Sequence, residues 1–302
     1  HGFNRPSSIH HLVGNLKNKK INLWKHKIVS PDAAGQQMIY QYGASLPGLA
    51  KGIMSLNFVK RKISFIAEGA KTIKYDFPNI LIETKPFETD IPLGFWRAVY
   101  DSQNSFANEC FIDELAYQGE IDPVELRLKH LDSNSRSVAV IKKAAKESSW
   151  RTKLKEGRFH GFAYHHSFGS HVAEVAEISV SKSNKVRVHN VTCVVDCGQT
   201  VNPMTIRAQM QSAIVFGIGA TLKSEITVNK GKVDQSNYDN YKVLRMDEMP
   251  RIDVHIIKNN EYPGGVGEPG LPPIAPAITN AVYAATGKRI RKLPIRPSDL
   301  RS

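Results

Sequence analysis

The sequence has few cysteines and no long apolar run. Its three cysteines are too few for a disulfide framework. Cys193 and Cys197 fall in a strand-like run, where four residues span about 13 Å, too far for the pair to share a metal ion. Cys110 lies in a helical pattern, where we expect a small core residue. No stretch of about 18 apolar residues occurs, which argues against a membrane-spanning helix. We therefore predict that the chain holds no iron–sulfur cluster of its own.

The amino end has neither an initiator methionine nor the layout of a signal peptide, since it begins His1-Gly2-Phe3. We expect the chain to be a portion of a longer polypeptide, and the compartment stays open. Its 302 residues, of which 41% are hydrophobic and 23% charged, suffice for one large or two ordinary domains with real cores.

The formal net charge of +13 allows two interpretations. Such a charge attracts polyanions, including nucleic acid. It is equally typical of a solvated basic surface, or of a subunit that meets an acidic partner. No zinc-finger spacing, basic helix or RNA-binding signature accompanies the charge, so nucleic acid is not the favoured partner.

Apolar periodicity in the first half predicts strands followed by helices. Alternation over 9–29 predicts a hairpin with a polar tip at Asn15–Lys20, ended by Pro31. Residues 32–57 are expected to be loop or short helix and 58–84 to be extended, with Pro86 and Pro92 bracketing a connector. Helical spacing then predicts helices over 103–118, 124–131 and 136–149, with Gly119 past the first and Asp122-Pro123 capping the second.

The second half returns to strands from Phe159. Strands are predicted over 171–181 and 186–195, with a turn at 181–184, and three short strands within 224–258. Asn202-Pro203 is expected to open a helix over 203–221, where Gly217 and Gly219 suggest close packing, and a last helix covers 274–286. We predict an α+β fold, strand-rich with segregated helices, in two regions, 1–150 and 151–302.

One stretch, residues 263–273, reads PGGVGEPGLPP and places an acid among glycines and prolines. The glycines let a ligand approach the backbone, and Pro269 biases Glu268 toward an extended conformation. A carboxylate held in this way can act as a general base. Spacing alone favours a simpler alternative, a tight turn with an exposed glutamate.

Two further stretches have the layout of a ligand-binding edge. Arg97 follows Phe95-Trp96 and precedes a helix that begins near Ser102–Asn104, an arrangement that suits an anion. Alternatively, Arg97 stacks on Trp96 or pairs with Asp101. In the other stretch, a strand ends at DCG (196–198) and leads into the capped helix that carries Gln209, which by itself is typical of a solvated glutamine.

Three segments together resemble a known family. They are GFWRAVYDSQNSFANECFIDELA, VVDCGQTVNPMTIRAQMQSAIVFGIG and GGVGEPGLPPIAPAITNAVYAATGKR, in this order. They resemble the large, molybdopterin-binding subunits of the xanthine oxidase-like molybdenum hydroxylases, in the isoquinoline oxidoreductase branch. HGFNRPSSIHHL at the amino end is similar to an internal segment of that branch. The likeness spans nearly the whole chain, so both predicted regions would belong to molybdopterin-binding parts.

The resemblance implies roles for individual residues. Glu268 would be the base that activates a molybdenum-bound hydroxide, and an aldehyde or N-heterocycle would be the substrate. Gln209 would hydrogen-bond the pterin. The remaining cofactor-side residues would be Arg97, Gln103, Asn104, Gly265 and Gly267. The cofactor would be molybdopterin cytosine dinucleotide, and electrons would leave through 2Fe–2S clusters on a separate small subunit.

The chain departs from the family in length, because the large subunits are roughly twice as long and their earlier cofactor motifs are not found before Arg97. We therefore expect a carboxyl-terminal portion that depends on the preceding part of the polypeptide and holds little molybdenum alone. Two alternatives remain: a catalytically silent scaffold with a basic surface, or a hydrolase that pairs Glu268 with His165-His166. The second has little support, because adjacent strand residues point to opposite faces.

Overall fold

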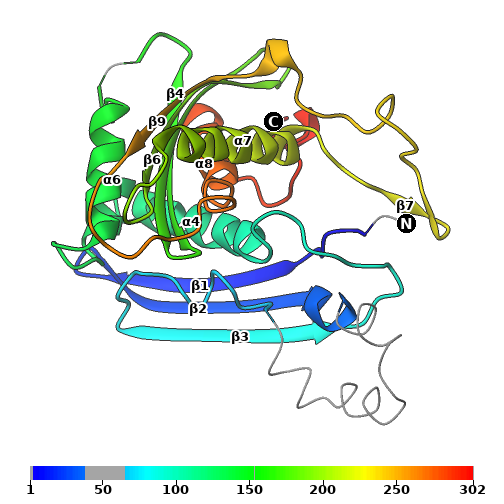
Figure 1. The fold of residues 1–302 in the computed structure, drawn as a ribbon, viewed down its shortest axis with the longest axis horizontal. Coiled ribbons are helices and arrows are strands. Elements are labelled where there is room, and N and C mark those ends of the chain that lie inside the picture. Colours follow the sequence, from blue (N-terminus) through cyan, green and yellow to red (C-terminus); the bar gives the residue numbers. More distant parts are fainter. Residues whose placement is uncertain (1–2, 38–64, 153, 302) are drawn as a thin grey trace.

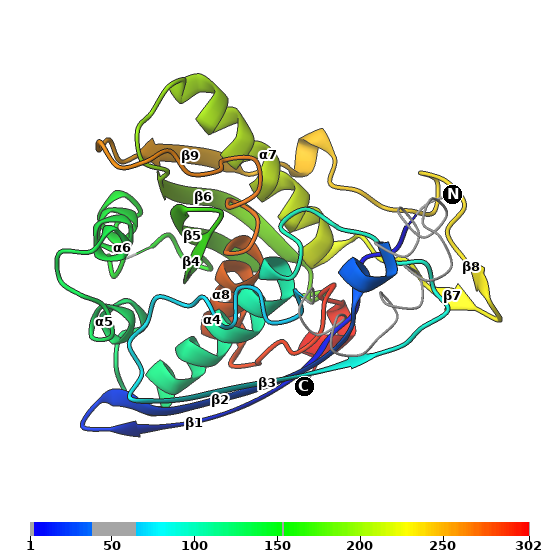
Figure 2. The same ribbon diagram turned by 60° about the horizontal axis from the view of Figure 1, so that its bottom comes forward.

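In the described part of the chain, the fold consists of two main β-sheets, with helices packed between and against them, and one small two-stranded sheet (Figures 1 and 2). The structure, a computed structural model, describes residues 3–37, 65–152 and 154–301. The sheet of the first half lies along one side of the molecule, and the helix that follows it in sequence lies between this sheet and the rest of the protein (Figure 1). The predicted α+β class is confirmed.

The first sheet has the order β1-β2-β3. β1 (Ile9–Lys17) and β2 (Lys20–Pro31) form the predicted hairpin, and β3 (Asn79–Phe87) pairs with β2 in parallel. The tip is tighter than predicted, because Asn18 and Lys19 alone make the turn, with φ of 51° and 55°. Two consecutive positive φ angles match the right-handed twist of the flanking strands.

The segment before and within β3 differs from the prediction. Residues 66–72 form turns instead of an extended strand, and the strand begins only at Asn79. Pro86, expected in a connector, lies inside β3. Among the described residues β3 is at the edge of its sheet, and an edge strand tolerates proline because the missing N–H need not interrupt a hydrogen-bond ladder on the outer side. Residues 33–37 are helical, as allowed for 32–57. The rest of that expectation, and residues 58–64, lie outside the described residues.

The second sheet has the order β4-β5-β6-β9. β4 (Phe159–Ser167), β5 (Ser170–Val180) and β6 (Val186–Asp196) form an antiparallel meander, which confirms the predicted strands, and β9 (Arg251–Ile256) runs parallel to β6. The two-residue strands β7 (Val228–Asn229) and β8 (Lys232–Val233) form a small arm, so the three short strands predicted within 224–258 are confirmed. Two short 3-10 helices are η1 (Met246–Glu248) and η2 (Pro297–Leu300).

The predicted helices are present, with small changes at their ends. They are α4 (Asp101–Gln118), α5 (Pro123–Leu128), α6 (Arg136–Glu147), α7 (Pro203–Leu222) and α8 (Ile274–Thr286). Asp122 accepts hydrogen bonds from the amides of Val124 and Glu125, and Asn202 caps α7 in the same way, as predicted. α5 ends three residues before the predicted limit at Leu131.

The core has two main parts, one on each face of the second sheet. On one face, Val195 of β6 packs with Ile214 of α7 and Ile278 of α8. On the other face, Phe162 of β4 belongs to a cluster with α4 and with Trp24 of the first sheet. α4 therefore lies between the two sheets, and this second cluster draws residues from both halves of the chain.

Glycines set how closely α8 approaches its neighbours. A Cβ on Gly161 of β4 would lie 2.1 Å from the Ala277 carbonyl oxygen and 2.2 Å from the Ala281 amide of α8. A Cβ on Gly217 of α7 would lie 2.3 Å from Ile274 Cγ2, which confirms close packing there. The same expectation for Gly219 is wrong, because its nearest neighbour would be Ser224 Oγ at 3.6 Å.

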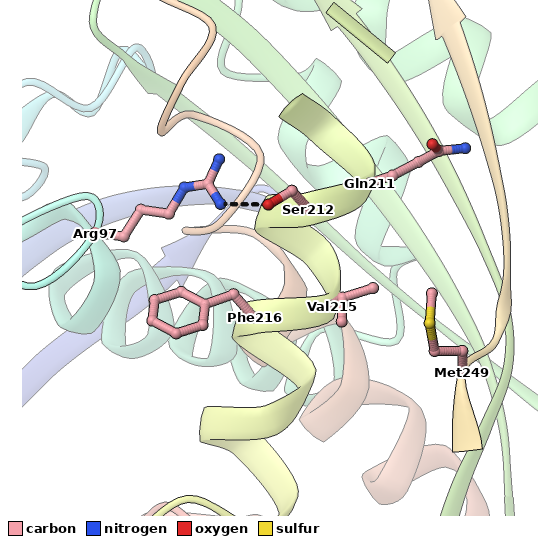
Figure 3. A pocket seen from close by; sticks show the side chains of 6 residues that line it. All are labelled: Arg97, Gln211, Ser212, Val215, Phe216 and Met249. Atoms are coloured by element: carbon pink, nitrogen blue, oxygen red, sulfur yellow. Dashed lines mark hydrogen bonds between the residues drawn. The ribbon is translucent and has the colours of Figure 1, made fainter. Parts of the chain in front are cut away.

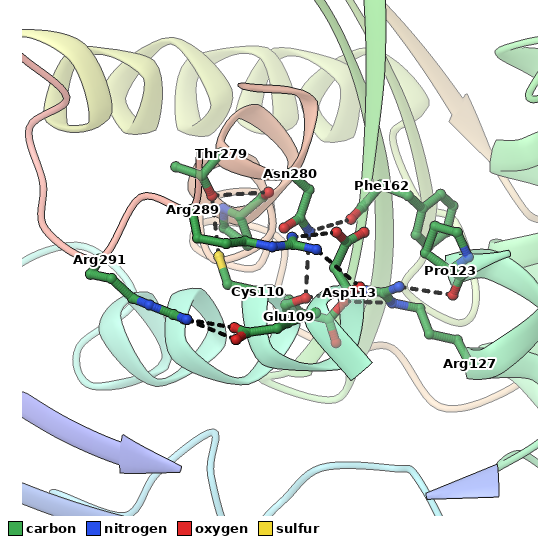
Figure 4. Close-up of polar contacts among 12 residues, drawn as sticks. Glu109, Cys110, Asp113, Pro123, Arg127, Phe162, Thr279, Asn280, Arg289 and Arg291 are labelled. Carbon is green, nitrogen blue, oxygen red and sulfur yellow. Dashed lines mark hydrogen bonds and ion pairs between the residues drawn. The ribbon is translucent and has the colours of Figure 1, made fainter. Parts of the chain in front are cut away.

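A buried ion pair joins α4, α5 and β4 (Figure 4). Arg127 Nε donates to Glu109 Oε2 at 2.8 Å, with side chains that are 0% and 2% exposed. The hydroxyl of Tyr75 and the amide of Tyr164 donate to the same carboxylate. The acids in the predicted helix 103–118 are thus not all solvated, since Glu109 has its charge balanced inside the protein.

Candidate functional site

Arg97 and Ala98 contact Gly267 and Glu268 in register. Arg97 Nε donates to the Gly267 carbonyl at 2.7 Å, and the Ala98 amide donates to Glu268 Oε1 at 2.9 Å. Ala98 and the next residue, Val99, adopt φ of 67° and 45°, a conformation that L residues with side chains rarely adopt. This unusual turn before α4 directs an amide at the carboxylate and fixes its position.

Arg97 also reaches α7 (Figure 3). Its Nη1 donates to Ser212 Oγ at 3.0 Å, and its Nη2 donates to Gln209 Oε1 at 2.9 Å. Three residues that the sequence singled out in separate segments, Arg97, Gln209 and Glu268, therefore lie in one cluster. Ser212 was missed, although a residue three positions after Gln209 lies on the same side of a helix.

Neither of the simpler interpretations of Arg97 is found. The guanidinium of Arg5, not that of Arg97, lies over the Trp96 ring, at 4.7 Å from its centroid. Asp101 Oδ1 instead forms a hydrogen bond with His165 Nε2 at 2.6 Å.

The hydrogen-bond acceptors of Arg97 are all neutral, namely a carbonyl, an amide oxygen and a hydroxyl. Burial lowers the pKa of Arg97, and the nearby Glu268 carboxylate partly offsets this. Because these acceptors leave the positive charge in place, the guanidinium can attract an anionic group while its plane is held by its hydrogen bonds.

The glycines around Glu268 differ in their surroundings. Gly265 donates its amide to the Phe168 carbonyl at 2.7 Å and accepts a hydrogen bond from Ser170 Oγ at 2.6 Å, so both of its polar backbone groups have protein partners. A Cβ on Gly264 would lie 2.6 Å from the Gly169 carbonyl oxygen. A Cβ on Gly267 would meet nothing within 4 Å, so the space beside it is open.

The turn after β6 supports this glycine loop. The Gly264 amide donates to the Cys197 carbonyl at 2.8 Å. Gly198, with φ of 75°, packs so closely on the loop that a Cβ would lie 2.3 Å from the Tyr262 carbonyl oxygen. The DCG sequence therefore contributes to the site through its backbone.

Gln103 and Asn104 point to different places. Gln103 Nε2 is buried and has no hydrogen-bond partner among the described residues, while its Oε1 accepts from Ser102 Oγ. Asn104 Nδ2 donates to the carbonyls of Ile66 and Glu68, so this side chain holds the turn at 66–72. Gln103 thus offers a donor to a bound group, and Asn104 organises the neighbouring loop.

A shallow cavity of about 520 Å³ adjoins the cluster. Arg97, Ser212 and Phe216 line it together with Gln211, Val215 and Met249 (Figure 3). Trp96 stacks on Phe216 with ring centroids 4.8 Å apart. Glu268 is not one of the lining residues. Arg97 is the residue that both lines the cavity and contacts the loop that carries Glu268.

The pairing of Glu268 with His165-His166 is not formed. His165 forms a hydrogen bond with Asp101, whereas the ring centroids of His166 and His171 lie 4.5 Å apart. Among the described residues no group of three or more histidine, cysteine or acidic side chains is arranged to hold a metal ion. In the same part of the chain, none of the helices combines the length and apolar character that crossing a bilayer requires.

Comparisons with known proteins identify the same family. The family described as "Molybdopterin cofactor-binding domain" matches residues 111–250. The beta subunit of isoquinoline 1-oxidoreductase from Brevundimonas diminuta is 34% identical over 230 residues, covering 75% of this chain and 29% of the relative. A subunit of nicotinate dehydrogenase from Pseudomonas putida is 33% identical over 247 residues, covering 76% of this chain and 21% of the relative. The chain thus spans less than a third of either relative's length.

Solved structures share the fold. Quinoline 2-oxidoreductase from Pseudomonas putida 86 superposes with a TM-score of 0.75 at 11% identity, over 98% of this chain and 62% of that one. Aldehyde oxidoreductase from Desulfovibrio gigas gives a TM-score of 0.75 at 14% identity, over 99% of this chain and 49% of that one. These structures share the fold, while the family match and the two sequence relatives show the family: the chain belongs to the molybdenum hydroxylases, as part of a molybdopterin-binding subunit.

Proposed function

We propose that this chain forms part of the active site of a molybdenum hydroxylase that oxidises aldehydes or N-heterocycles, with Glu268 as the general base. The observation that carries the proposal is the meeting of Glu268, Arg97 and Gln209, which are up to 171 positions apart in the sequence, at one surface. The names of the two sequence relatives, an isoquinoline oxidoreductase and a nicotinate dehydrogenase, support the N-heterocycle class.

The donor groups at this surface suit a pterin dinucleotide. None of the hydrogen-bond acceptors of Arg97 carries a charge, so its guanidinium can also attract a phosphate. Gln103 Nε2 is a buried donor with no partner in the described part of the chain, and Gln209 accepts from Arg97 through Oε1, which leaves its amide nitrogen to face a ligand. Together these three side chains would hold the cofactor, in the cytosine dinucleotide form.

The bound cofactor supplies the redox centre that accepts two electrons from the substrate. The contribution of this chain is acid–base chemistry and orientation. The Ala98 amide holds one oxygen of Glu268, and the second oxygen makes no hydrogen bond to the described residues. That oxygen can accept the proton released as water-derived oxygen is transferred to the substrate.

The remaining parts of the enzyme would come from other polypeptide. We propose that further chain of the same large subunit completes the pocket, since this chain spans 29% of the isoquinoline relative. A small subunit with 2Fe–2S clusters would accept the electrons. Each of the two sequence relatives is itself named as one subunit of its enzyme, which supports such an assembly.

Glu268→Gln tests the base. In the cofactor-loaded enzyme, we expect kcat to fall by about 10²–10⁴-fold, because the amide has no proton-accepting oxygen of comparable basicity. The molybdenum content should stay near that of the unmodified protein. Glu261→Gln is the control, since this glutamate is exposed and lies seven residues before Glu268. A Glu268→Gln enzyme that turns over at a normal rate would remove Glu268 from this role.

A further inference from the structure

The tip of the β4–β5 hairpin holds the glycine loop, residues 263–268, which ends in the proposed base. The two strands are joined by a two-residue turn, Phe168-Gly169. The Gly265 amide donates to the Phe168 carbonyl at 2.7 Å, and Ser170 Oγ donates to the Gly265 carbonyl at 2.6 Å. Both polar backbone groups of one loop residue are therefore bound by the hairpin tip.

The backbone conformation of this turn is unusual. Phe168 and Gly169 have φ of 53° and 76°. Glycine adopts such angles without strain, whereas a residue with a side chain rarely does, and hairpins with this kind of turn favour asparagine or aspartate at the first position. Unfavourable conformations of this type persist where the surrounding structure requires them. Here the turn brings the Phe168 carbonyl and the Ser170 hydroxyl to the same loop residue.

The glycine loop depends on such contacts for its shape. Gly264, Gly265 and Gly267 lie within four consecutive positions, and glycines leave the backbone many conformations. The loop packs closely on the hairpin tip, because a Cβ on Gly264 would lie 2.6 Å from the Gly169 carbonyl oxygen and 2.6 Å from Ser170 Oγ. Ser170 itself is fully buried, so in this conformation its hydroxyl is committed to the loop.

The residue that Ser170 binds lies three positions before the proposed base. At the other end of the segment 265–268, the Ala98 amide donates to Glu268 Oε1 at 2.9 Å. Ser170 and Ala98 thus hold the two ends of one short segment against different elements of the fold. Because this segment is rich in glycine, release of its first end lets the carboxylate move, and a small displacement of a reacting group slows a reaction strongly.

We propose that Ser170 is a positioning residue for Glu268: its hydroxyl fixes the start of the segment 265–268, so that the carboxylate stays where it can remove a proton from the substrate side. This inference rests on the proposed function. Ser170 acts through the backbone of the loop, so its contribution is orientation and not proton transfer. It sets the fraction of molecules in which the base is correctly placed.

Hydrogen exchange of the purified protein tests the contact without turnover. In Ser170→Ala, amide exchange over 263–271 should become about two- to tenfold faster, whereas exchange over α8 should be unchanged. Ser167→Ala is the matched control. Ser167 pairs with Ser170 across the same turn and is also buried, but its hydroxyl has no hydrogen-bond partner among the described residues. Loop exchange in Ser170→Ala that equals that of the unmodified protein would overturn the proposal.

Kinetics of the cofactor-loaded enzyme test the role of the contact. Ser170→Ala should lower kcat and kcat/KM together, by about tenfold, while KM stays within about twofold of its normal value, because only the alignment of the reacting group is lost. The loss should be smaller than in Glu268→Gln, since Arg97 still holds the Gly267 carbonyl.

Ser167→Ala should match the unmodified enzyme in both constants. An unchanged kcat in Ser170→Ala, in an enzyme that Glu268→Gln inactivates, would overturn the positioning role alone. A Glu268→Gln enzyme with normal turnover would refute the proposed function, and the role of Ser170 with it.

Discussion

Two charged clusters border α4, and they differ in what balances their charge. Glu109 and Arg127 balance each other inside the core and are hydrogen-bonded on nearly every side. Arg97, on the turn before the same helix, donates hydrogen bonds to neutral acceptors at the edge of a cavity. Glu268 accepts one hydrogen bond, from the backbone amide of Ala98. The first arrangement holds three elements together, whereas the second keeps its charges available to a ligand.

Glu109→Gln should have the largest effect on stability. It leaves the Arg127 guanidinium buried without its counter-charge, so we expect the free energy of unfolding to fall by about 3–5 kcal/mol, as measured by chemical denaturation. Glu114→Gln is the matched control on the same helix, because its partner Arg291 is 62% exposed and such pairs contribute about 0–1 kcal/mol. Equal losses in the two variants would show that the core pair has no special part in stability.

Arg97→Lys should act mainly on the cofactor. A lysine keeps the positive charge but cannot bond Gly267, Gln209 and Ser212 at once, so affinity should fall by about 1.5–3 kcal/mol, or roughly 10–150-fold. The molybdenum content of the purified enzyme and its denaturation curve would be measured together. A stability loss as large as that of Glu109→Gln, with full cofactor content, would show that Arg97 serves the fold instead of the ligand.

Buried histidines should make the fold sensitive to acid. Burial, and then the positive charge of neighbouring groups, lowers the pKa of His26 and of His166 to about 3 from 6.5. Between these values the unfolded chain binds more protons, so stability should fall as pH drops from about 6.5, by up to about 1.4 kcal/mol per histidine per pH unit.

Denaturation at a series of pH values checks this expectation, and His26→Gln should flatten the dependence. The exposed His11 supplies the control, because His11→Gln should change the slope little. A stability that stays level down to pH 5 would contradict the burial argument.

Lys143→Gln should have the smallest effect. Lys143 and Glu147 form a partly exposed pair one turn apart on α6, at 3.1 Å. The free energy of unfolding should fall by about 0.3–0.5 kcal/mol, which sets the scale for a charge that neither the core nor the site uses. A loss above about 1 kcal/mol would mean that exposed pairs matter here as much as buried ones.

Local signals in the sequence were enough to predict most elements. Asn202-Pro203 and Asp122-Pro123 predict helix starts, because an N-cap side chain and a first-turn proline stabilise the helix within its first turn. Pro86 misled the prediction of β3, because whether a proline fits a strand depends on which neighbours the strand has, and the position of β3 at an edge is a property of the whole sheet.

The site was predictable only in part, for the same reason. Glu268 stands out by its glycines and prolines, yet the amide that holds it belongs to Ala98, 170 residues away. Ser212 could have been found from helical spacing, whereas contacts between distant segments need the assembled fold.

Gly161 sets the depth at which α8 lies against β4. Because glycine has no side chain, α8 can lie this close to β4. A single methyl group there would overlap the backbone of α8 and push the helix away from the sheet. Because α8 starts only six residues after Glu268, such a lift would carry the carboxylate away from the Ala98 amide. The absence of a side chain at Gly161 is therefore needed to keep Glu268 aligned with the Ala98 amide.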